Sequence, residues 1–345
     1  MGSTAVEHDG LVIPIINFSD FLLSDRSPEA KAAAAKAILE AFQTSGFLYL
    51  SHTPIPPDLL ALVFDNSARF FEQGGEFKTR YLWSTADANR GYSAPGREKV
   101  TQLTRAEEVG SLRERAPDLK ESFEIGREDE PGHPNHWPES DNLPDFKRVM
   151  TEFHRRCHEL NVGVMRAIAV GMGLEEGFFD KFVDKGDNTL RLLHYPPVKR
   201  EMFRQGAIRA GEHSDYGSIT LLFQDRRGGL QVRAPGGKFV DVRPVEGTVV
   251  VNAGDLLARW ANDGVKSTIH RVVEPPPPPP SKEGEGAGEG VEEYPARYSV
   301  AYFCNPNFDS FIEAIPGTYG GEKGEKKYEG IYSGEYLVQR LSATY

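Results

Sequence analysis

Three potential metal ligands, His213, Asp215 and His270, form the most informative pattern in this chain of 345 residues. Two histidines and one carboxylate that hold one face of an iron ion leave the opposite face open, and this is the ligand set of non-haem Fe(II) oxygenases. Downstream, Arg297 and Ser299 stand two residues apart, where a guanidinium and a hydroxyl suit a co-substrate that carries a carboxylate. The pattern predicts an enzyme that activates O₂ on iron with 2-oxoglutarate.

The neighbouring residues place these ligands on strands. His213 and Asp215 are two positions apart, so an extended segment would project both side chains from one face. An apolar, β-prone run follows at 219–223, and His270 lies within the β-branched run 267–273. Ligands so far apart in sequence converge where a sheet folds back on itself, as in a jelly roll or cupin. A zinc site is the alternative for three such ligands, but the Arg297 and Ser299 pair would serve no purpose there.

Apolar periodicity predicts helices mainly in the first half of the chain and strands in the second. Helices are expected at 28–42, where Ser27 is the N-cap and Pro28 the first helical residue, and at 57–71, 144–172 and 335–341. Strands are expected at 12–16, 47–50, 190–194, 219–223, 230–232, 239–242, 248–251, 267–273 and 297–303. The pairs Gly228-Gly229 and Gly236-Gly237 are typical of hairpin turns.

These elements predict a mainly β protein with flanking helices, built on a double-stranded β-helix (jelly-roll) core with N-terminal helices and a long supporting helix. We expect an N-terminal helical and strand region at 1–142 with turn-rich, substrate-side loops from residue 72, and a long supporting helix region at 143–187. The catalytic core would span 188–310 and a C-terminal segment 311–345. Residues 275–290, six prolines followed by Gly/Glu repeats, indicate an exposed insertion. A proline-rich ligand for a partner domain is the alternative.

The bulk properties agree with a soluble intracellular enzyme. A net charge of −11 argues against nucleic-acid binding, which needs a basic face. No apolar run is long enough to cross a membrane, and residues 1–10 lack the pattern of a secretory signal, so we expect a cytoplasmic location. Cys157 and Cys304 are expected to be buried free thiols. The sequence leaves the oligomeric state open.

Beyond the ligands, the chain resembles the Fe(II)/2-oxoglutarate oxygenases of the isopenicillin N synthase type along nearly its whole length. The blocks that carry the resemblance occur in order: IPIINFSDF, GFLYLSHTPI, KESFEIG, LRLLHYPP, the His-x-Asp block, VNAGDLL, STIHRVV and RYSVAYF. Four longer blocks resemble the fungal thymine dioxygenases: NRGYSAPGREKVTQLT, KESFEIGREDEPGHPN, RAGEHSDYGSITLLFQD and RYSVAYFCNPN.

The resemblance assigns roles to residues at matching positions. It implies that iron binds His213, Asp215 and His270, and that Arg297 and Ser299 hold the distal carboxylate of 2-oxoglutarate. Tyr195 would contact the proximal carboxylate. Leu193 stands where many plant members of the family have an asparagine, so one polar contact of that subfamily is absent.

The likeness to thymine dioxygenases further implies a pocket for a free pyrimidine base. Tyr216 and Phe303 would be its aromatic faces, and Arg191 would donate a hydrogen bond to a ring carbonyl. The implied reaction hydroxylates the thymine 5-methyl group and oxidises it stepwise to 5-carboxyuracil, with succinate and CO₂ as co-products. Without the resemblance, Tyr216 and Phe303 are explained as core packing, whereas the charge of Arg191 among leucines must find a partner. The alternatives are an oxygenase of the same fold that acts on a secondary metabolite, and a binding module that has lost catalysis.

Overall fold

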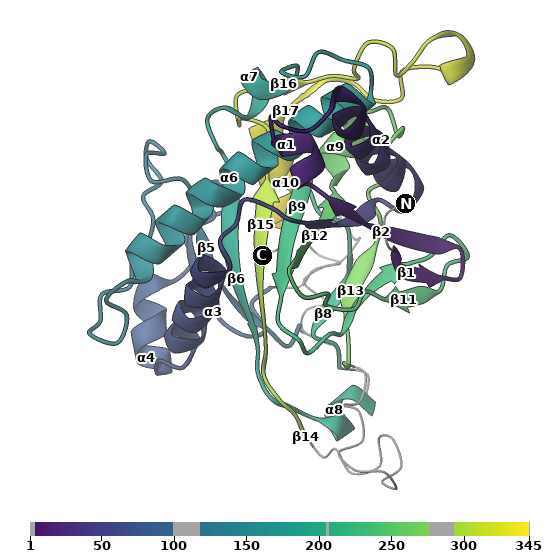
Figure 1. The fold of residues 1–345 in the computed structure, drawn as a ribbon. Coiled ribbons are helices and arrows are strands. Elements are labelled where there is room, and N and C mark those ends of the chain that lie inside the picture. Colours follow the sequence, from purple (N-terminus) through teal and green to yellow (C-terminus); the bar gives the residue numbers. More distant parts are fainter. Residues whose placement is uncertain (1–3, 99–117, 205–206, 276–292, 345) are drawn as a thin grey trace, which may run out of the picture.

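Two β-sheets face each other in the computed structural model, and helices cover the outer side of the larger one (Figure 1). The structure describes residues 4–98, 118–204, 207–275 and 293–344. The larger sheet has the strand order β1-β2-β3-β12-β9-β15-β6-β5-β4, and the smaller sheet has the order β11-β10-β13-β8. All neighbouring strands are antiparallel except β2 and β3, which are parallel. The protein is therefore a mixed α/β structure dominated by antiparallel sheets.

The strands of the larger sheet are β1 (Thr4–His8), β2 (Leu11–Asn17), β3 (Phe47–Ser51), β12 (Thr248–Ala253), β9 (Ile219–Gln224), β15 (Arg297–Cys304), β6 (Thr189–Tyr195), β5 (Glu121–Ile125) and β4 (Gly91–Ser93). Those of the smaller sheet are β11 (Phe239–Asp241), β10 (Leu230–Arg233), β13 (His270–Val272) and β8 (Ala210–His213). Two short pairs join β7 (Val198–Lys199) to β14 (Glu293–Tyr294), and β16 (Phe311–Ile312) to β17 (Ile331–Tyr332). The helices are α1 (Ser19–Leu22), α2 (Pro28–Thr44), α3 (Pro57–Phe71), α4 (Gly75–Lys78), α6 (Phe146–Gly171), α7 (Asp180–Val183), α8 (Arg200–Arg204), α9 (Asp255–Trp260) and α10 (Ser333–Thr344).

The helical layer is organised by α6, whose apolar side is buried along its whole length. Phe153 on this side packs edge to face against Phe223 of β9, with ring centroids 5.2 Å apart. At the other end of α6, a Cβ on Gly171 would lie 2.8 Å from the carbonyl oxygen of Ala35, so the glycine allows α6 and α2 to come close together. The start of α2 is as predicted, because Ser27 accepts a hydrogen bond from the Ala30 amide at 3.2 Å.

The central strand β15 separates two cores because its side chains alternate between its two faces. Val300 and Tyr302 belong to the core between the larger sheet and the helices. Ala301 belongs to the core between the two sheets, against which Phe303 packs. Arg297 and Ser299, which alternate in the same way with Ala301 and Phe303, therefore point into the space between the sheets.

Most predicted elements are confirmed, including the long helix, the C-terminal helix and the later strands. The turn at Gly236-Gly237 joins the paired strands β10 and β11, as expected of a hairpin. The prediction for Gly228-Gly229 is wrong, because β9 and β10 lie in different sheets and the glycines carry the chain from one sheet to the other. None of the helices in the described ranges is long and apolar enough to cross a membrane.

The prediction of residues 72–142 as turn-rich loops missed β5, which lies inside the larger sheet between β6 and β4. All five residues of β5 are buried, and two of them are glutamates. Its glutamates, Glu121 and Glu124, are three positions apart and so lie on opposite faces of the strand. A charge on each face is not typical of a buried strand, so the pattern concealed a strand whose charges have partners inside the protein. Most of the predicted insertion at 275–290 lies outside the described residues.

Removing the aromatic ring that joins α6 to β9 tests this packing. We expect Phe153→Ala to lower the free energy of unfolding by about 3–5 kcal/mol, because a fully buried ring leaves a cavity. Urea denaturation followed by far-UV circular dichroism measures the change. The matched control Leu62→Ala, at a leucine that is 43% exposed, should shift stability by less than about 0.5 kcal/mol. Equal effects of the two substitutions would contradict the assigned core.

Candidate active site

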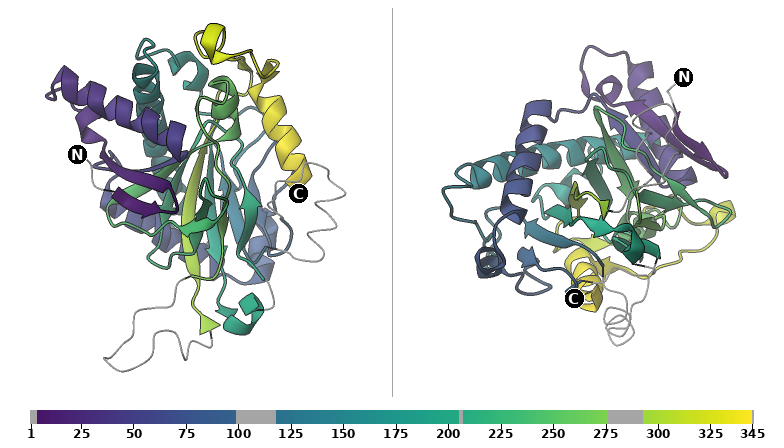
Figure 2. Two further views of the ribbon diagram at one scale, coloured as in Figure 1. Left: turned by 90° about the vertical axis from the view of Figure 1, so that its right-hand side faces the viewer. Right: turned by 90° about the horizontal axis from the view of Figure 1, so that it is seen from below.

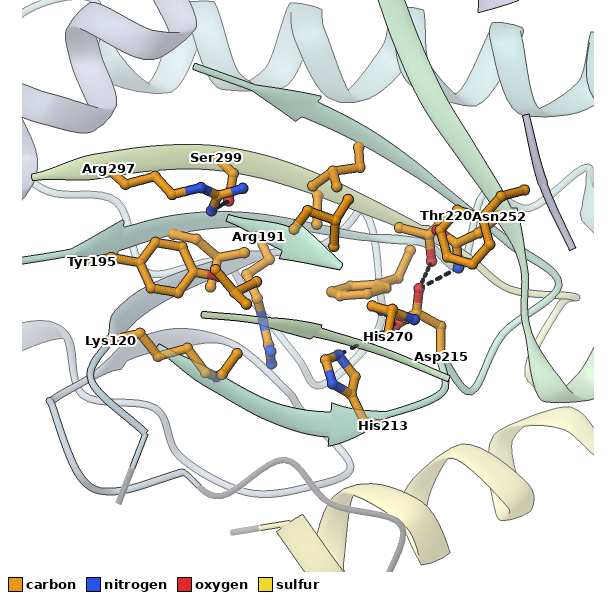
Figure 3. Close-up of a pocket in the computed structure, with 18 residues that line it drawn as sticks. Lys120, Arg191, Tyr195, His213, Asp215, Thr220, Asn252, His270, Arg297 and Ser299 are labelled. Atoms are coloured by element: carbon orange, nitrogen blue, oxygen red, sulfur yellow. Dashed lines mark hydrogen bonds and ion pairs between the residues drawn. The ribbon is translucent and has the colours of Figure 1, made fainter. Parts of the chain in front are cut away.

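A cavity lies between the two sheets and brings together most of the residues singled out in the sequence (Figure 3). Eight of the nine predicted site residues line it, namely Arg191, Tyr195, His213, Asp215, His270, Arg297, Ser299 and Phe303. The ninth, Tyr216, lines an adjoining cavity that shares Arg191, His213, Asp215 and Phe303 with the first. The predicted site residues therefore converge on one site.

The two histidines meet because β8 and β13 are paired in an antiparallel register that sets His213 opposite His270. Asp215 follows β8 by two residues and turns back toward them. Its Oδ1 atom lies 4.0 Å from Nε2 of His213 and 3.6 Å from Nε2 of His270. Within the described ranges, these three side chains form the one group of His, Cys, Asp and Glu residues placed to share a metal ion, with candidate ligand atoms within 4.8 Å of one another.

Backbone carbonyls orient both imidazoles for metal binding. Nδ1 of His213 donates to the Gly211 carbonyl at 2.7 Å, and Nδ1 of His270 donates to the Thr268 carbonyl at 3.1 Å. The proton on Nδ1 leaves Nε2 as the lone-pair donor, as metal-binding histidines require. Burial and the neighbouring His270 lower the pKa of His213 to about 3, so its imidazole is neutral and ready to bind a cation.

Asp215 has one oxygen occupied by the protein and one turned toward the histidines. Its Oδ2 accepts hydrogen bonds from Thr220 Oγ1 at 2.5 Å and from Asn252 Nδ2 at 2.8 Å (Figure 3). Burial alone would raise the pKa of Asp215, but the two histidines and these hydrogen bonds outweigh burial and lower it. With Oδ1 as the single oxygen on offer, the site suits an ion bound by three protein atoms on one face.

The sequence analysis did not single out Thr220 and Asn252. Asn252 is a buried amide that follows three valines in β12, next to β9. That is a usable signal, because buried polar side chains need partners. Thr220 gives no comparable signal, since threonine is common in strands.

At the other end of the cavity, the Arg297 guanidinium is held rigidly and is 1% exposed. Its Nε donates to the Gly228 carbonyl at 2.8 Å, Nη2 donates to Gln224 Oε1 at 3.1 Å, and Nη1 lies 3.2 Å from the Ser299 hydroxyl. The guanidinium also stacks on the Tyr195 ring, with Cζ 4.9 Å from the ring centroid. A buried cation beside two hydroxyl-bearing side chains is suited to an anionic carboxylate.

Arg191 lies between the two cavities, and carboxylates balance its charge. Its Nη1 donates to Glu98 Oε1 at 3.0 Å, and its Nε lies 2.7 Å from Glu124 Oε1. Lys120, which lines the first cavity, is paired with the same Glu98. Burial would raise the pKa of Glu98, but Arg191 and Lys120 outweigh it and lower the pKa to about 2. The sequence predicted that the buried charge of Arg191 must have a partner, and that partner is a pair of buried glutamates.

Neither glutamate was predicted as part of the site. Glu124 stands in a segment whose strand was missed, and Glu98 lies in the same stretch, 72–142, which the sequence predicted to be turn-rich loops. Burial raises the pKa of Glu124 despite its contact with Arg191, and the nearby Glu98 raises it further. One of the two carboxylates next to Arg191 is thus kept charged while ionisation of the other is disfavoured.

The adjoining cavity has the character of a pocket for a small planar molecule. Tyr216 and Phe303 line it together with Asn89, Thr189 and the leucines Leu337 and Leu341 of α10. The Arg191 guanidinium lies over the Phe303 ring, with Cζ 5.4 Å from the centroid. Aromatic faces, aliphatic side chains and a few polar groups next to the metal ligands are typical of a substrate site.

Comparison with known proteins agrees with this geometry. Residues 13–140 match the family model described as non-haem dioxygenase in morphine synthesis N-terminal, and residues 186–306 match that of the 2OG-Fe(II) oxygenase superfamily. A 2-oxoglutarate-Fe(II) type oxidoreductase of Metarhizium rileyi is 32% identical over 336 residues, which cover 96% of this chain and 90% of the relative. The chain belongs to the 2-oxoglutarate/Fe(II) oxygenase superfamily. It is a 2-oxoglutarate-dependent dioxygenase that uses Fe(II).

Two solved structures of the thymine 7-hydroxylase of Neurospora crassa are more similar still. The complex with alpha-KG (2-oxoglutarate) and thymine is 60% identical with a TM-score of 0.89, covering 99% of this chain and 100% of the other. The complex with alpha-KG and 5-formyluracil is 56% identical with a TM-score of 0.87, covering 100% of both chains. The likeness therefore extends over essentially the whole chain.

The metal site is tested most directly by removing its carboxylate. We expect Asp215→Ala to abolish turnover and to weaken Fe(II) binding, measured by metal titration in the absence of O₂, while circular dichroism stays unchanged. Asp141→Ala, an exposed carboxylate in a loop, is the matched control and should bind iron normally. Normal iron affinity in Asp215→Ala would show that this triad is not the iron site.

The co-substrate end is tested at Arg297. We expect Arg297→Leu to raise the KM for 2-oxoglutarate sharply, because a charge-assisted contact to a carboxylate is lost, while Fe(II) affinity changes little. Arg297→Lys keeps the charge but not the fork of donors, and it should fall between the wild type and the leucine variant. Steady-state kinetics with varied 2-oxoglutarate measure both. An unchanged KM in a folded Arg297→Leu variant would make Arg297 a structural residue.

Proposed function

We propose that this dioxygenase hydroxylates the 5-methyl group of thymine and oxidises the product stepwise to 5-carboxyuracil. Support comes from the Neurospora thymine 7-hydroxylase structures, at 56–60% identity over essentially the whole chain, whose ligands are thymine and 5-formyluracil. In 5-formyluracil the thymine methyl group has become an aldehyde, which lies between the alcohol and the acid. One site that accepts both molecules would suit successive oxidations of one carbon atom.

We assign iron to His213, Asp215 and His270, and 2-oxoglutarate to Tyr195, Arg297 and Ser299. The assignment is supported by the three converging ligand atoms at one end of the cavity and the buried guanidinium at the other. With O₂ and 2-oxoglutarate, bound Fe(II) supplies the oxidising chemistry that releases succinate and CO₂. The protein side chains bind, orient and exclude water: Arg297 and Ser299 grip the carboxylate, and Tyr195 borders it.

For thymine we assign Tyr216 and Phe303 as aromatic faces and Arg191 as the donor to a ring carbonyl. The observation that carries this proposal is that all three side chains line the cavity that also contains His213 and Asp215. Stacking of a base on an aromatic ring is worth roughly 1–3 kcal/mol. The Glu98 and Glu124 carboxylates restrain the Arg191 guanidinium, so a donor would meet the base without a large loss of side-chain entropy.

We further propose that the paired sheets form a double-stranded β-helix, with regions at 1–142, 143–187, 188–310 and 311–345. The two facing antiparallel sheets with ligands between them support this topology. Strands from residues 1–142 extend the core sheet at both edges, through β3 beside β12 and β5 beside β6. An N-terminal region built in this way would brace the catalytic core.

The competing proposal is an oxygenase of the same fold that acts on a different small molecule. Curated relatives at 30–35% identity include a proline hydroxylase of Petromyces alliaceus, so the fold accommodates other substrates. Succinate release from 2-oxoglutarate in the presence of candidate substrates separates the two proposals.

Thymine and uracil provide the decisive comparison, because uracil lacks the methyl group that is oxidised. We expect thymine to stimulate succinate formation far more than uracil, and mass spectrometry to show products with added oxygen. Phe303→Ala should lower kcat/KM for thymine by a factor that corresponds to roughly 1–3 kcal/mol. Phe311→Ala, at a ring that is 49% exposed, is the control and should leave it unchanged. An active enzyme that ignores thymine and oxidises another metabolite would overturn the substrate and leave the dioxygenase in place.

A further inference from the structure

The C-terminal helix α10 forms one wall of the proposed substrate cavity. Leu337 and Leu341 of α10 line that cavity opposite the sheet residues, and Leu341 is 5% exposed. The helix lies on the side of the molecule opposite to β1 and β2 (Figure 2, left) and passes close to the end of β8, which carries His213 (Figure 3). The position of this wall depends on the contacts that hold α10 against the rest of the protein.

One carboxylate, that of Asp255 at the start of α9, attaches α10 to the metal-binding segments. Its Oδ2 accepts hydrogen bonds from Arg340 at 2.9 Å, from Tyr336 at 3.4 Å and from Ser214 at 3.1 Å. Its Oδ1 accepts one from Ser267 at 2.6 Å. Ser214 stands between His213 and Asp215, and Ser267 precedes His270 by three residues. Asp255 therefore connects the C-terminal helix to the segments that carry all three metal ligands.

Backbone contacts make the same connection. The Asp255 amide donates to the Asp215 carbonyl at 2.8 Å, and the Leu256 amide donates to the Tyr216 carbonyl at 3.2 Å. A Cβ on Gly254 would lie 2.3 Å from the Gly217 carbonyl oxygen and 3.1 Å from that of Asp215. The segment 215–217 and the start of α9 are therefore in direct backbone contact. A displacement of Asp255 would consequently displace Asp215 and Tyr216 as well.

Arg340 also makes a second contact, with the aromatic face assigned to the substrate. Its guanidinium carbon lies 4.4 Å from the centroid of the Tyr216 ring. The side chains of Arg340 and Asp255 are 19% and 18% exposed. Cation–π contacts and ion pairs of this kind are stronger when partly desolvated than at an open surface. The Arg340 guanidinium thus contacts the Tyr216 ring and also holds α10 against Asp255.

We propose that Arg340 is a positioning residue, which through Asp255 and Tyr216 seats α10 and the Tyr216 ring around the substrate. Binding of the oxidisable substrate depends on this contact, whereas binding of 2-oxoglutarate and Fe(II) does not. Arg297, His213 and His270 stand on strands of the two sheets, and the Asp215 carboxylate is held by Thr220 of β9 and Asn252 of β12. The proposal rests on the proposed function for its probe, thymine, and for the stacking role of Tyr216.

The test compares Arg340→Gln, Arg340→Lys and the exposed control Gln339→Ala on the same helix, all in the full chain. We expect Arg340→Gln to raise the KM for thymine by roughly tenfold, and to increase the share of 2-oxoglutarate consumed without thymine oxidation. The KM for 2-oxoglutarate and the Fe(II) affinity should stay within about twofold of the wild type. Arg340→Lys should recover part of the loss, and Gln339→Ala should behave as the wild type does.

Hydrogen–deuterium exchange provides a readout that does not depend on turnover. The amides of α10 should exchange faster in Arg340→Gln than in the wild type or in Gln339→Ala, in the absence of any substrate. Exchange of α10 that is unchanged in Arg340→Gln overturns the proposal, as does an unchanged KM for thymine. A parallel loss of iron and 2-oxoglutarate binding also overturns it, because Arg340 would then be a general structural residue. A wild-type enzyme that does not turn over thymine refutes the proposed substrate instead, and the exchange comparison still decides the role of Arg340.

Discussion

The antiparallel register that sets His270 opposite His213 is the constraint on which the rest of the site depends. Register in a sheet is strict because a shift by one residue turns every side chain to the opposite face. A slip here would point one imidazole away from the space between the sheets and break the hydrogen bonds that hold both Nδ1 atoms. The register is fixed by apolar neighbours such as Leu230, Val232 and Val272, which fill the core between the sheets. The placement of the two imidazoles therefore depends on the packing of apolar side chains between the sheets.

Burying several charges in this space is costly unless each finds a partner. Arg191 is paired with Glu98 and lies against Glu124. The fully buried Arg209 donates a hydrogen bond to the Pro295 carbonyl and lies against the Tyr195 ring. Burial lowers the pKa of Arg209 to about 10, and the nearby Arg297 contributes to the shift. With Arg209 and Arg297 on the side of Tyr195, that end of the cavity carries excess positive charge. Such a field favours a dianionic co-substrate there and a neutral substrate at the other end.

The sequence identified the residues that carry the chemistry, but it missed several residues that form the walls of the pocket. His213, Asp215 and His270 could be found because few residue types bind iron and their context was β-prone. Glu98 and Glu124 could not be found, because charges in turn-rich sequence resemble a solvated surface until the fold shows them buried. Leu337 and Leu341 were assigned to a helix, but nothing local to a helix shows which cavity it will close. Contacts between distant segments are decided by the whole fold, and these are the contacts that the sequence left open.

The metal ligands and the walls of the adjoining cavity lie on different parts of the chain, which explains how relatives can differ in substrate. The iron ligands and Arg297 belong to the paired sheets or the short loop that follows β8, where a change in backbone would disturb the register. The proposed substrate cavity is completed by segments outside those strands, such as the loop containing Asn89 and the helix containing Leu337. Segments of this kind tolerate change because fewer backbone hydrogen bonds depend on them. A family that shares one oxidative chemistry and differs in substrates is what such an arrangement permits, since the two functions rest on different parts of the chain.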